Sequence, residues 1–137
     1  MNDLFNTSVP AGFTNVNSYV FLNDPQGMIT FCEHVFYAEE KSRTLRENGD
    51  IANVILQIGD TCIMLAQAPP AIGPTPSCFY LYTSNVDHLY QRALDHGAQS
   101  VFPPGDQDYG DRSGGVKDPF GNYWWISKRL VEGDYGG

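Results

Sequence analysis

The sequence predicts an α+β fold in which a βαβββ module occurs twice. Two stretches have the apolar periodicity of amphipathic helices, and each follows one strand-like run and precedes three more. The second set repeats the first with an offset of about sixty residues. Between them, residues 68–77 (APPAIGPTPS) carry four prolines and a glycine, as is typical of a connection between modules. We therefore expect one domain over 1–137, with modules at about 14–67 and 78–129 and a flexible tail at 131–137.

The first module is expected to open with a strand at 16–22 and to continue with a helix. Asn23 or Asp24 can cap the first free N–H groups of this helix, and Pro25 suits its first turn. Five apolar residues form one helical stripe: Met28, Ile29, Cys32, Val35 and Phe36. Three strand-like runs follow, at 40–47, Ile51–Ile58 and Thr61–Gln67.

The second module repeats this order, with a strand at 78–83 and then a helix. Asn85 is the expected N-cap, and Gly97 is expected to end the helix. The apolar stripe is Val86, Leu89, Tyr90, Ala93 and Leu94. The strands that follow are expected near 99–102, 113–117 and 122–127. Each module leaves one sheet face without a helix, so we expect the two faces to form a curved, half-closed mixed sheet around a partly apolar cavity.

Composition limits the classes of partner and the location. A net charge of −8 argues against nucleic acid and against an anionic membrane surface. The sequence contains no apolar run of 18 residues, so it predicts no membrane-spanning helix. Residues 1–13 lack the pattern of a secretory signal. Cys32, Cys62 and Cys78 have no CxxC spacing and are predicted to be free thiols. Free thiols favour a cytoplasmic location.

Three motifs carry a resemblance to a known family. They are YVFLNDPQGMITFCEHVFYAEE (19–40), DHLYQRALDHGA (87–98) and GDRSGGVKDPFGNYWW (110–125). Over about 15–128 the chain resembles the vicinal oxygen chelate superfamily, which includes glyoxalase I, bleomycin-resistance proteins and extradiol dioxygenases. The last motif is similar to the glyoxalase-like branch related to bleomycin-resistance proteins. The resemblance implies the paired βαβββ fold and a homodimer, but no particular activity.

Metal-dependent members of that superfamily use His, Glu or Gln ligands, one from each of four strands. The resemblance places these positions at Asn17, Met64, Cys78 and Trp125, with Tyr80 as the rival to Cys78. A thioether and an indole are unsuitable for a divalent cation that prefers carboxylate or imidazole ligands. His34, His88 and His96 are predicted on the polar sides of the two helices and do not replace these ligands. We therefore expect no metal and no cofactor.

Strand alternation instead predicts rings and amides on the uncovered sheet faces. The candidate ligand-binding residues are Asn17, Tyr19, Asn53, Gln57, Met64, Cys78, Tyr80, Tyr123 and Trp125. This mixture suits a planar or apolar organic molecule that stacks on Trp125 and Tyr80 and is oriented by the amides. The alternative is that the rings fill the cavity themselves and act only as core.

The loop at 106–115 offers a further candidate, Arg112. Asp111 and Arg112 are expected to pair and to fix the loop over the cavity mouth. Alternatively, Arg112 binds an anionic group of a substrate.

Three functions follow from these patterns. The first is a metal-independent protein that binds a small organic molecule, in order to sequester or to sense it. The second is a metal-dependent lyase, isomerase or dioxygenase of the same superfamily. The third is a protein-interaction module whose exposed rings form an interface. The absence of any metal-ligand set at the expected positions favours the first.

Overall fold

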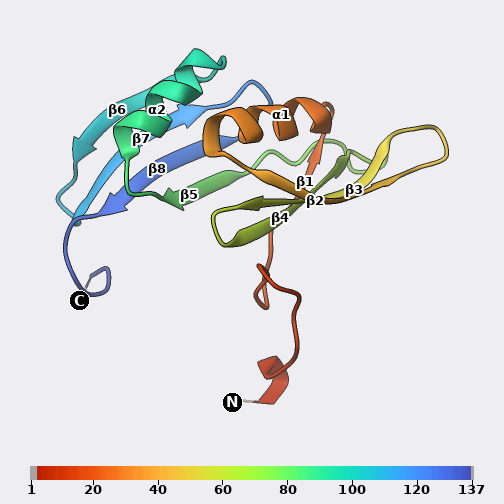
Figure 1. The fold of residues 1–137 in the computed structure, drawn as a ribbon, viewed down its shortest axis with the longest axis horizontal. Coiled ribbons are helices and arrows are strands. Elements are labelled where there is room, and N and C mark those ends of the chain that lie inside the picture. The colour runs from red at the N-terminus through yellow and green to blue at the C-terminus, as the bar shows by residue number, and fades with distance from the viewer. Residues whose placement is uncertain (1–2, 137) are drawn as a thin grey trace. The chain divides into compact units, whose positions relative to one another are not determined.

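A computed structural model describes residues 3–136, which divide into two compact units between Thr75 and Pro76. The boundary between them falls inside the predicted connection at 68–77. Each unit carries one α-helix and a four-stranded sheet among its described residues (Figure 1). The α+β class and the repeated βαβββ order are therefore confirmed. That the two units act as one domain stays a prediction.

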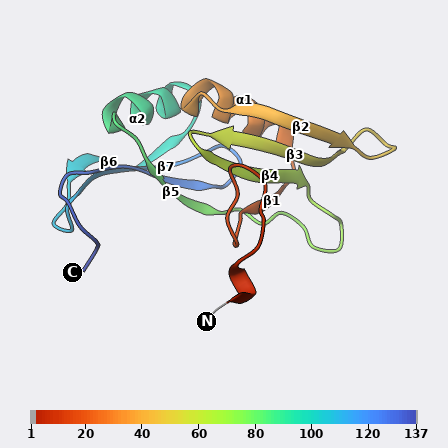
Figure 2. The ribbon, with the colours of Figure 1, turned by 60° about the horizontal axis from the view of Figure 1, so that its bottom comes forward.

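The first unit has its sheet strands in the order β1-β4-β3-β2. Strand β1 pairs with β4 in parallel, and the other neighbours are antiparallel, so the sheet is mixed. The helix lies on one face of this sheet (Figure 2). The elements are η1 (Asp3–Phe5), β1 (Tyr19–Leu22), α1 (Pro25–Phe36), β2 (Glu39–Leu45), β3 (Ile51–Ile58) and β4 (Thr61–Gln67).

Helix α1 begins and ends where local chemistry dictates. The Asp24 side chain accepts a hydrogen bond from the backbone N–H of Gly27 at 2.9 Å, and Pro25 occupies the first turn. The helix ends at Tyr37, which adopts a left-handed conformation with φ of 57°. The predicted apolar stripe is buried in full, from Met28 to Phe36.

The first strand is shorter than the sequence predicts. It begins at Tyr19, whereas Val16 is 86% exposed and does not pack under the helix. The reason is a local turn: the Asn17 side chain accepts from the Thr14 N–H at 2.8 Å and donates to the Thr14 carbonyl at 2.5 Å. This side chain bonds the backbone in place of a strand neighbour, which keeps 14–17 out of the ladder.

The second unit repeats the plan, with strands in the order β5-β8-β7-β6 and a parallel β5–β8 pair. Its elements are β5 (Cys78–Tyr82), α2 (Val86–Asp95), β6 (Gln99–Asp106), β7 (Asp111–Lys117) and β8 (Tyr123–Arg129). Strand β6 extends beyond the predicted end at Phe102, through Pro103 and Pro104. Proline is tolerated there because β6 is an edge strand, which pairs with a neighbour on one side only and therefore does not need every backbone N–H as a donor.

Helix α2 also follows its predicted signals. Asn85 caps it by accepting from the His88 N–H at 3.2 Å, and Gly97 ends it with φ of 100°. Among the residues that the structure describes, no helix is both long and apolar enough to span a bilayer.

The Asp118 carboxylate organises the turn between β7 and β8. One oxygen accepts from the backbone N–H groups of Phe120 and Asn122, both at 2.9 Å. The other accepts from the Trp124 indole N–H at 2.9 Å and from the Asn122 amide at 3.0 Å. Asp118 is only 3% exposed, so this network lies inside the unit. It fixes Trp124 on the helix side of the sheet, where its ring stacks on Phe79.

We expect Asp118→Ala to destabilise the protein by about 2–4 kcal/mol. The substitution leaves a buried indole N–H and two backbone N–H groups without their acceptor. Urea unfolding followed by circular dichroism measures the loss. Asp108→Ala, at an exposed position, is the matched control and should change little. Equal stability of the two variants would contradict the role given to Asp118.

Candidate functional site

Aromatic side chains gather on the sheet face of the second unit that lies opposite α2. The strand register places Tyr80 of β5 directly beside Trp125 of β8, and Trp125 directly beside Gly115 of β7. The alternate residues Trp124 and Ile126 are buried on the helix side, as predicted. We call this surface the ring face, which comprises Tyr80, Tyr82, Phe102, Tyr123 and Trp125.

Gly115 gives the ring face its width. A Cβ atom at this position would lie 2.4 Å from the Phe102 ring, so only glycine lets that ring cross β7. The Phe102 ring then meets Trp125 edge to face, with 5.6 Å between ring centroids. Three rings from three strands therefore lie in one row: Tyr80, Trp125 and Phe102. The sequence analysis did not single out Phe102.

The rings of this face remain partly exposed to solvent. Tyr80 is 44% exposed, Tyr82 is 56% exposed and Tyr123 is 37% exposed. Trp125 is half-buried, with Tyr123 at 6.1 Å between ring centroids. Within the second unit, the face presents aromatic surface on which a planar molecule can stack.

A buried carboxylate, Asp111, lies at the edge of the ring face. It is fully buried and accepts hydrogen bonds from the Tyr80 hydroxyl at 2.5 Å and the Tyr135 hydroxyl at 2.6 Å. The Arg129 guanidinium donates to its other oxygen at 3.1 Å. The Tyr82 and Tyr135 hydroxyls are also hydrogen-bonded to each other. We call these five residues the Asp111 cluster.

The cluster sets the charge state of its members. Burial alone would raise the pKa of Asp111, but the hydrogen bonds from Tyr135, Tyr80 and Arg129, with the Arg129 charge, lower it. Burial and the hydrogen bond to Asp111 raise the pKa of Tyr80 to about 12. Burial and the same carboxylate also raise the pKa of Tyr135. At neutral pH the site therefore holds an ionised carboxylate surrounded by protonated phenols.

The first unit carries the other predicted residues on the face of its own sheet opposite α1. Tyr19 lies beside Met64, and Met64 lies beside Ile55 on β3. Asn53 and Gln57 are two residues to either side of Ile55 and share its face. The Gln57 amide donates to the Gly59 carbonyl at 2.9 Å, so part of its hydrogen-bonding capacity is used locally.

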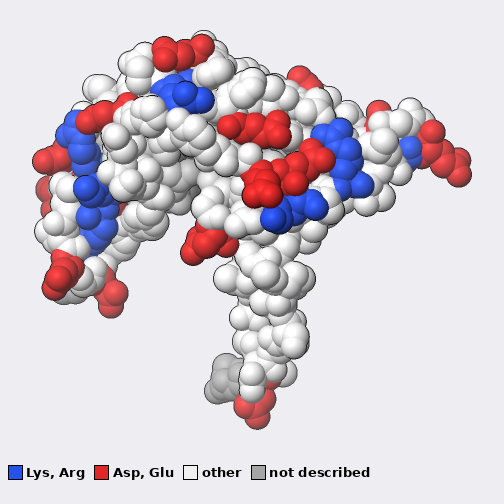
Figure 3. Space-filling model, viewed as in Figure 1, with Lys and Arg blue, Asp and Glu red and all other residues white. Residues whose placement is uncertain are grey.

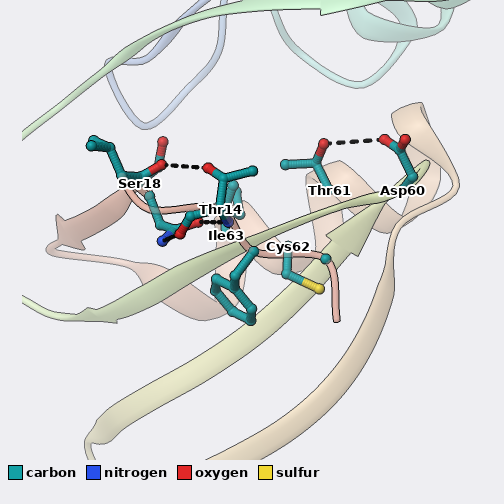
Figure 4. A pocket seen from close by; sticks show the side chains of 10 residues that line it. Thr14, Ser18, Asp60, Thr61, Cys62 and Ile63 are labelled. Carbon is teal, nitrogen blue, oxygen red and sulfur yellow. Dashed lines mark hydrogen bonds between the residues drawn. The ribbon is translucent and has the colours of Figure 1, made fainter. Parts of the chain in front are cut away.

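A shallow pocket of about 320 Å³ lies in the first unit, away from these strand centres. Figure 4 shows it between the segment before β1 and the start of β4, with Thr14, Ser18 and Thr61 around it. Asn17 lines this pocket and not the sheet face, because its amide is held by Thr14. The expectation that Asn17 shares a strand face with Tyr19 is wrong.

The expected ion pair within residues 106–115 is also corrected. Asp111 and Arg112 do not pair: adjacent strand residues point to opposite faces, so Asp111 meets Arg129 on the ring-face side. Arg112 instead contacts Asp87 of α2 at 2.9 Å and Asp106 at 3.1 Å. The three cysteines are free, as predicted; Cys78 is exposed, whereas Cys32 and Cys62 are buried.

Surface charges lie mainly in mixed groups. On the face shown in Figure 3, Lys and Arg side chains lie next to Asp and Glu side chains. Arg43 pairs with Glu40 at 2.8 Å, and Lys41 pairs with Glu39 at 3.4 Å. The excess of acidic residues thus coexists with local neutralisation of several cations.

The comparison with protein families decides the class. The model described as Glyoxalase/Bleomycin resistance protein/Dioxygenase superfamily matches residues 14–126. The chain belongs to this superfamily. An uncharacterized protein of Mycobacterium bovis, Mb0911c, is 30% identical over 128 residues, which cover 85% of this chain and 84% of that protein. The uncharacterized protein Rv0887c of Mycobacterium tuberculosis is also 30% identical, with 85% and 75% covered.

Solved structures agree on the fold. The crystal structure of TioX from Micromonospora sp. ML1 matches with a TM-score of 0.69 and 23% identity, covering 88% of this chain and 100% of that chain. A member of the same superfamily from Sphaerobacter thermophilus matches with a TM-score of 0.66 and 18% identity, covering 85% and 98%. At these identities the likeness concerns the fold alone.

The resemblance assigns the metal-ligand positions to Asn17, Met64, Cys78 and Trp125. The strand register places Tyr19 directly beside Met64 and Tyr80 directly beside Trp125. Phenol, thioether, phenol and indole do not fit a divalent metal any better than the first set. Tyr80 also keeps its proton, with a pKa of about 12. Among residues 3–136 no group of three or more His, Cys, Asp or Glu side chains could hold a metal ion.

We expect Asp111→Asn to destabilise the protein at pH 7 by on the order of 2 kcal/mol, because the amide weakens three charge-assisted hydrogen bonds. A lowered pKa in the folded state means that the carboxylate stabilises the fold above its ordinary pKa of about 3.9. That contribution is lost as the pH falls through the folded-state value. Wild type and variant should therefore approach each other in stability below pH 4.

Urea unfolding at a series of pH values measures this difference. Asp108→Asn removes one exposed charge and serves as the matched control. A stability difference between wild type and Asp111→Asn that stays constant from pH 7 to pH 3 would contradict the charge state given to the cluster.

Proposed function

We propose that this protein is a metal-independent binder of a planar or apolar organic molecule, which it sequesters or senses. One observation carries the proposal: where metal-dependent members of the superfamily place ligands on the last module, this chain has the exposed Tyr80 ring beside the half-buried Trp125 ring. Stacked rings each contribute on the order of 1 kcal/mol beyond the burial of their area. The ring face supplies several such contacts.

The polar neighbours of the rings would orient the ligand. Lys117 lies over the Tyr123 ring, 5.6 Å from its centroid, and supplies a cation beside the exposed rings. A ligand with an aromatic body and a polar substituent satisfies both kinds of group. In the first unit Tyr19, Asn53, Gln57 and Met64 form a comparable surface, and we propose that they contribute to binding as well.

Two further properties remain proposals. The superfamily resemblance supports a homodimer, which light scattering on the purified protein tests. The free cysteines support a cytoplasmic location.

Nuclear magnetic resonance can test the ring face directly, because the two tryptophans give two indole N–H signals. With quinoline as a planar aromatic probe, we expect a saturable shift of the Trp125 signal and little change at buried Trp124. Trp125→Ala should weaken quinoline binding about fivefold, the equivalent of one lost stacking contact. Trp125→Phe assigns the two signals.

The control variant is Tyr37→Ala, which removes a ring that is 62% exposed at the end of α1. This variant should bind quinoline as the wild type does. If neither indole signal moves at saturating quinoline, the ring face is not a ligand site. That result would favour the third function, a protein-interaction module whose exposed rings form an interface.

Metal content separates the proposal from the metal-dependent lyase, isomerase or dioxygenase. We expect untagged, dialysed protein to contain far less than one equivalent of manganese, iron, nickel or zinc by mass spectrometry. Quinoline binding should be the same with and without EDTA, because no ring-face residue is a metal ligand. A transition metal that co-purifies near one per chain and is needed for binding would favour the second function.

A further inference from the structure

The chain after β8 turns back onto the sheet of its own unit. The sequence predicts a flexible tail at 131–137, yet its described part, up to 136, makes specific contacts. Arg129 donates to the carbonyl oxygens of Gly133 and Asp134, both at 3.3 Å. Gly133 has φ of 96°, a backbone conformation that favours glycine and allows the reversal. Figure 1 shows this return beyond the end of β8.

The turn delivers the Tyr135 side chain to the Asp111 cluster. Its hydroxyl lies 2.6 Å from an oxygen of Asp111 and is hydrogen-bonded to Tyr82. The Arg129 guanidinium lies over its ring, 4.2 Å from the centroid. Tyr109 flanks the ring at 6.5 Å between centroids. The hydroxyl and the ring of Tyr135 thus each meet a complementary group.

The direction of each hydrogen bond follows from the charge of the carboxylate. Asp111 can only accept, so Tyr135 donates its single hydroxyl proton to it. The Tyr82 hydroxyl then donates to the Tyr135 oxygen, since that is the remaining arrangement in which both bonds form. The site offers an acceptor for a phenol proton, a donor for a phenol oxygen and a cation for an aromatic ring.

The site does not need Tyr135 to exist. Tyr135 is 49% exposed and lies outside the last strand, so the core does not depend on it. Without Tyr135, Asp111 keeps the hydrogen bonds from Tyr80 and Arg129, which hold the carboxylate in place. The fully buried carboxylate then faces the volume that the tail has left.

We propose that the Tyr135 side chain is an internal ligand, which occupies a subsite for phenols formed by Asp111, Arg129 and Tyr82. An external phenol of suitable shape displaces the tail and takes its place. The subsite adjoins the ring face through Tyr80, whose hydroxyl bonds the same carboxylate oxygen. It goes beyond the proposed function and needs no contact with Trp125.

The probe is p-cresol, which is the tyrosine side chain as a free molecule, and toluene is its counterpart without the hydroxyl. We expect full-length Tyr135→Ala to bind p-cresol at least about tenfold more tightly than the wild type does, by calorimetric titration. Toluene should bind this variant about tenfold more weakly than p-cresol, because it cannot donate to Asp111.

Two variants make the test specific. Tyr135→Phe keeps a ring in the subsite, so its gain in p-cresol affinity should be much smaller than that of Tyr135→Ala. Tyr135→Ala combined with Asp111→Asn should lose most of the preference for p-cresol over toluene, because the charged acceptor is gone. Circular dichroism checks that each variant is folded. If Tyr135→Ala does not fold, deletion of residues 131–137 carries the same expectations.

Tyr135→Phe provides a second measurement, independent of those two variants. Its tail lacks the hydrogen bond to Asp111, so p-cresol should release it, and the amide signals of Gly133 and Gly136 should move toward disordered positions. Equal p-cresol affinity in wild type and Tyr135→Ala, or equal affinity of p-cresol and toluene, would overturn the subsite. A tail that stays in place at saturating p-cresol would do the same.

Adding Trp125→Ala to Tyr135→Ala separates this inference from the proposed function. The gain in p-cresol affinity should persist in that background, whereas quinoline binding should fall. Failure of the p-cresol test therefore counts against the subsite alone, and failure of the quinoline test counts against the ring face alone.

Discussion

The hydrogen bond from the Trp124 indole to the Asp118 carboxylate decides which of two adjacent tryptophans faces the core. Successive residues of a strand point to opposite faces, so fixing Trp124 on the helix side places Trp125 on the other side. The same carboxylate holds the turn that starts β8, which fixes the register of that strand against its neighbours. Tyr80 lies beside Trp125 because of that register. The ring face thus depends on a contact made on the opposite side of the sheet.

This arrangement explains how the superfamily scaffold can change its chemistry without changing its fold. The helix-facing residues of β8 and β7, such as Ile126 and Val116, are fully buried and determine the packing. The alternate residues of each strand project from the face that no helix covers, and they contribute little to the packing of the core. A carboxylate there can hold a metal, whereas an indole there, as at Trp125, offers a stacking surface. The scaffold therefore identifies the place where function is located, but only the side chains at that place decide which function.

The sequence predicted most of the fold because its signals are local. Asp24 and Asn85 cap the helices, and Gly97 ends one of them. The apolar stripe of α1 is buried in full, and that of α2 is buried at Val86, Leu89 and Ala93. Strand ends were less predictable. The Asn17 turn shortens β1, and an edge strand tolerates Pro103 and Pro104, and neither effect follows from apolar periodicity.

The candidate site was predicted only in part, for the same reason. Alternation correctly placed Tyr80, Tyr123 and Trp125 on one face, because it is a property of each strand alone. It could not reveal that Phe102 crosses the sheet over Gly115, since that contact joins two different strands. It also could not reveal the position of Tyr135. The contacts between Asp111 and its partners Arg129, Tyr135 and Tyr80 span 18, 24 and 31 residues.

The two buried carboxylates of the second unit show how sequence separation distinguishes a structural group from an exchangeable one. The groups described as donating to the Asp118 carboxylate lie two to six residues from it and include two backbone N–H groups, which no ligand can displace. Asp111 is as deeply buried, but its partners are side chains from distant elements, and two of them end in half-exposed phenols. A buried carboxylate needs hydrogen-bond donors around it, but its burial does not determine which groups supply them. Where the satisfying side chain lies outside the sheet and is half-exposed, as that of Tyr135 is, a free molecule with the same donor can compete for it. The partners of each carboxylate, and not its burial, therefore determine whether a ligand could replace one of them.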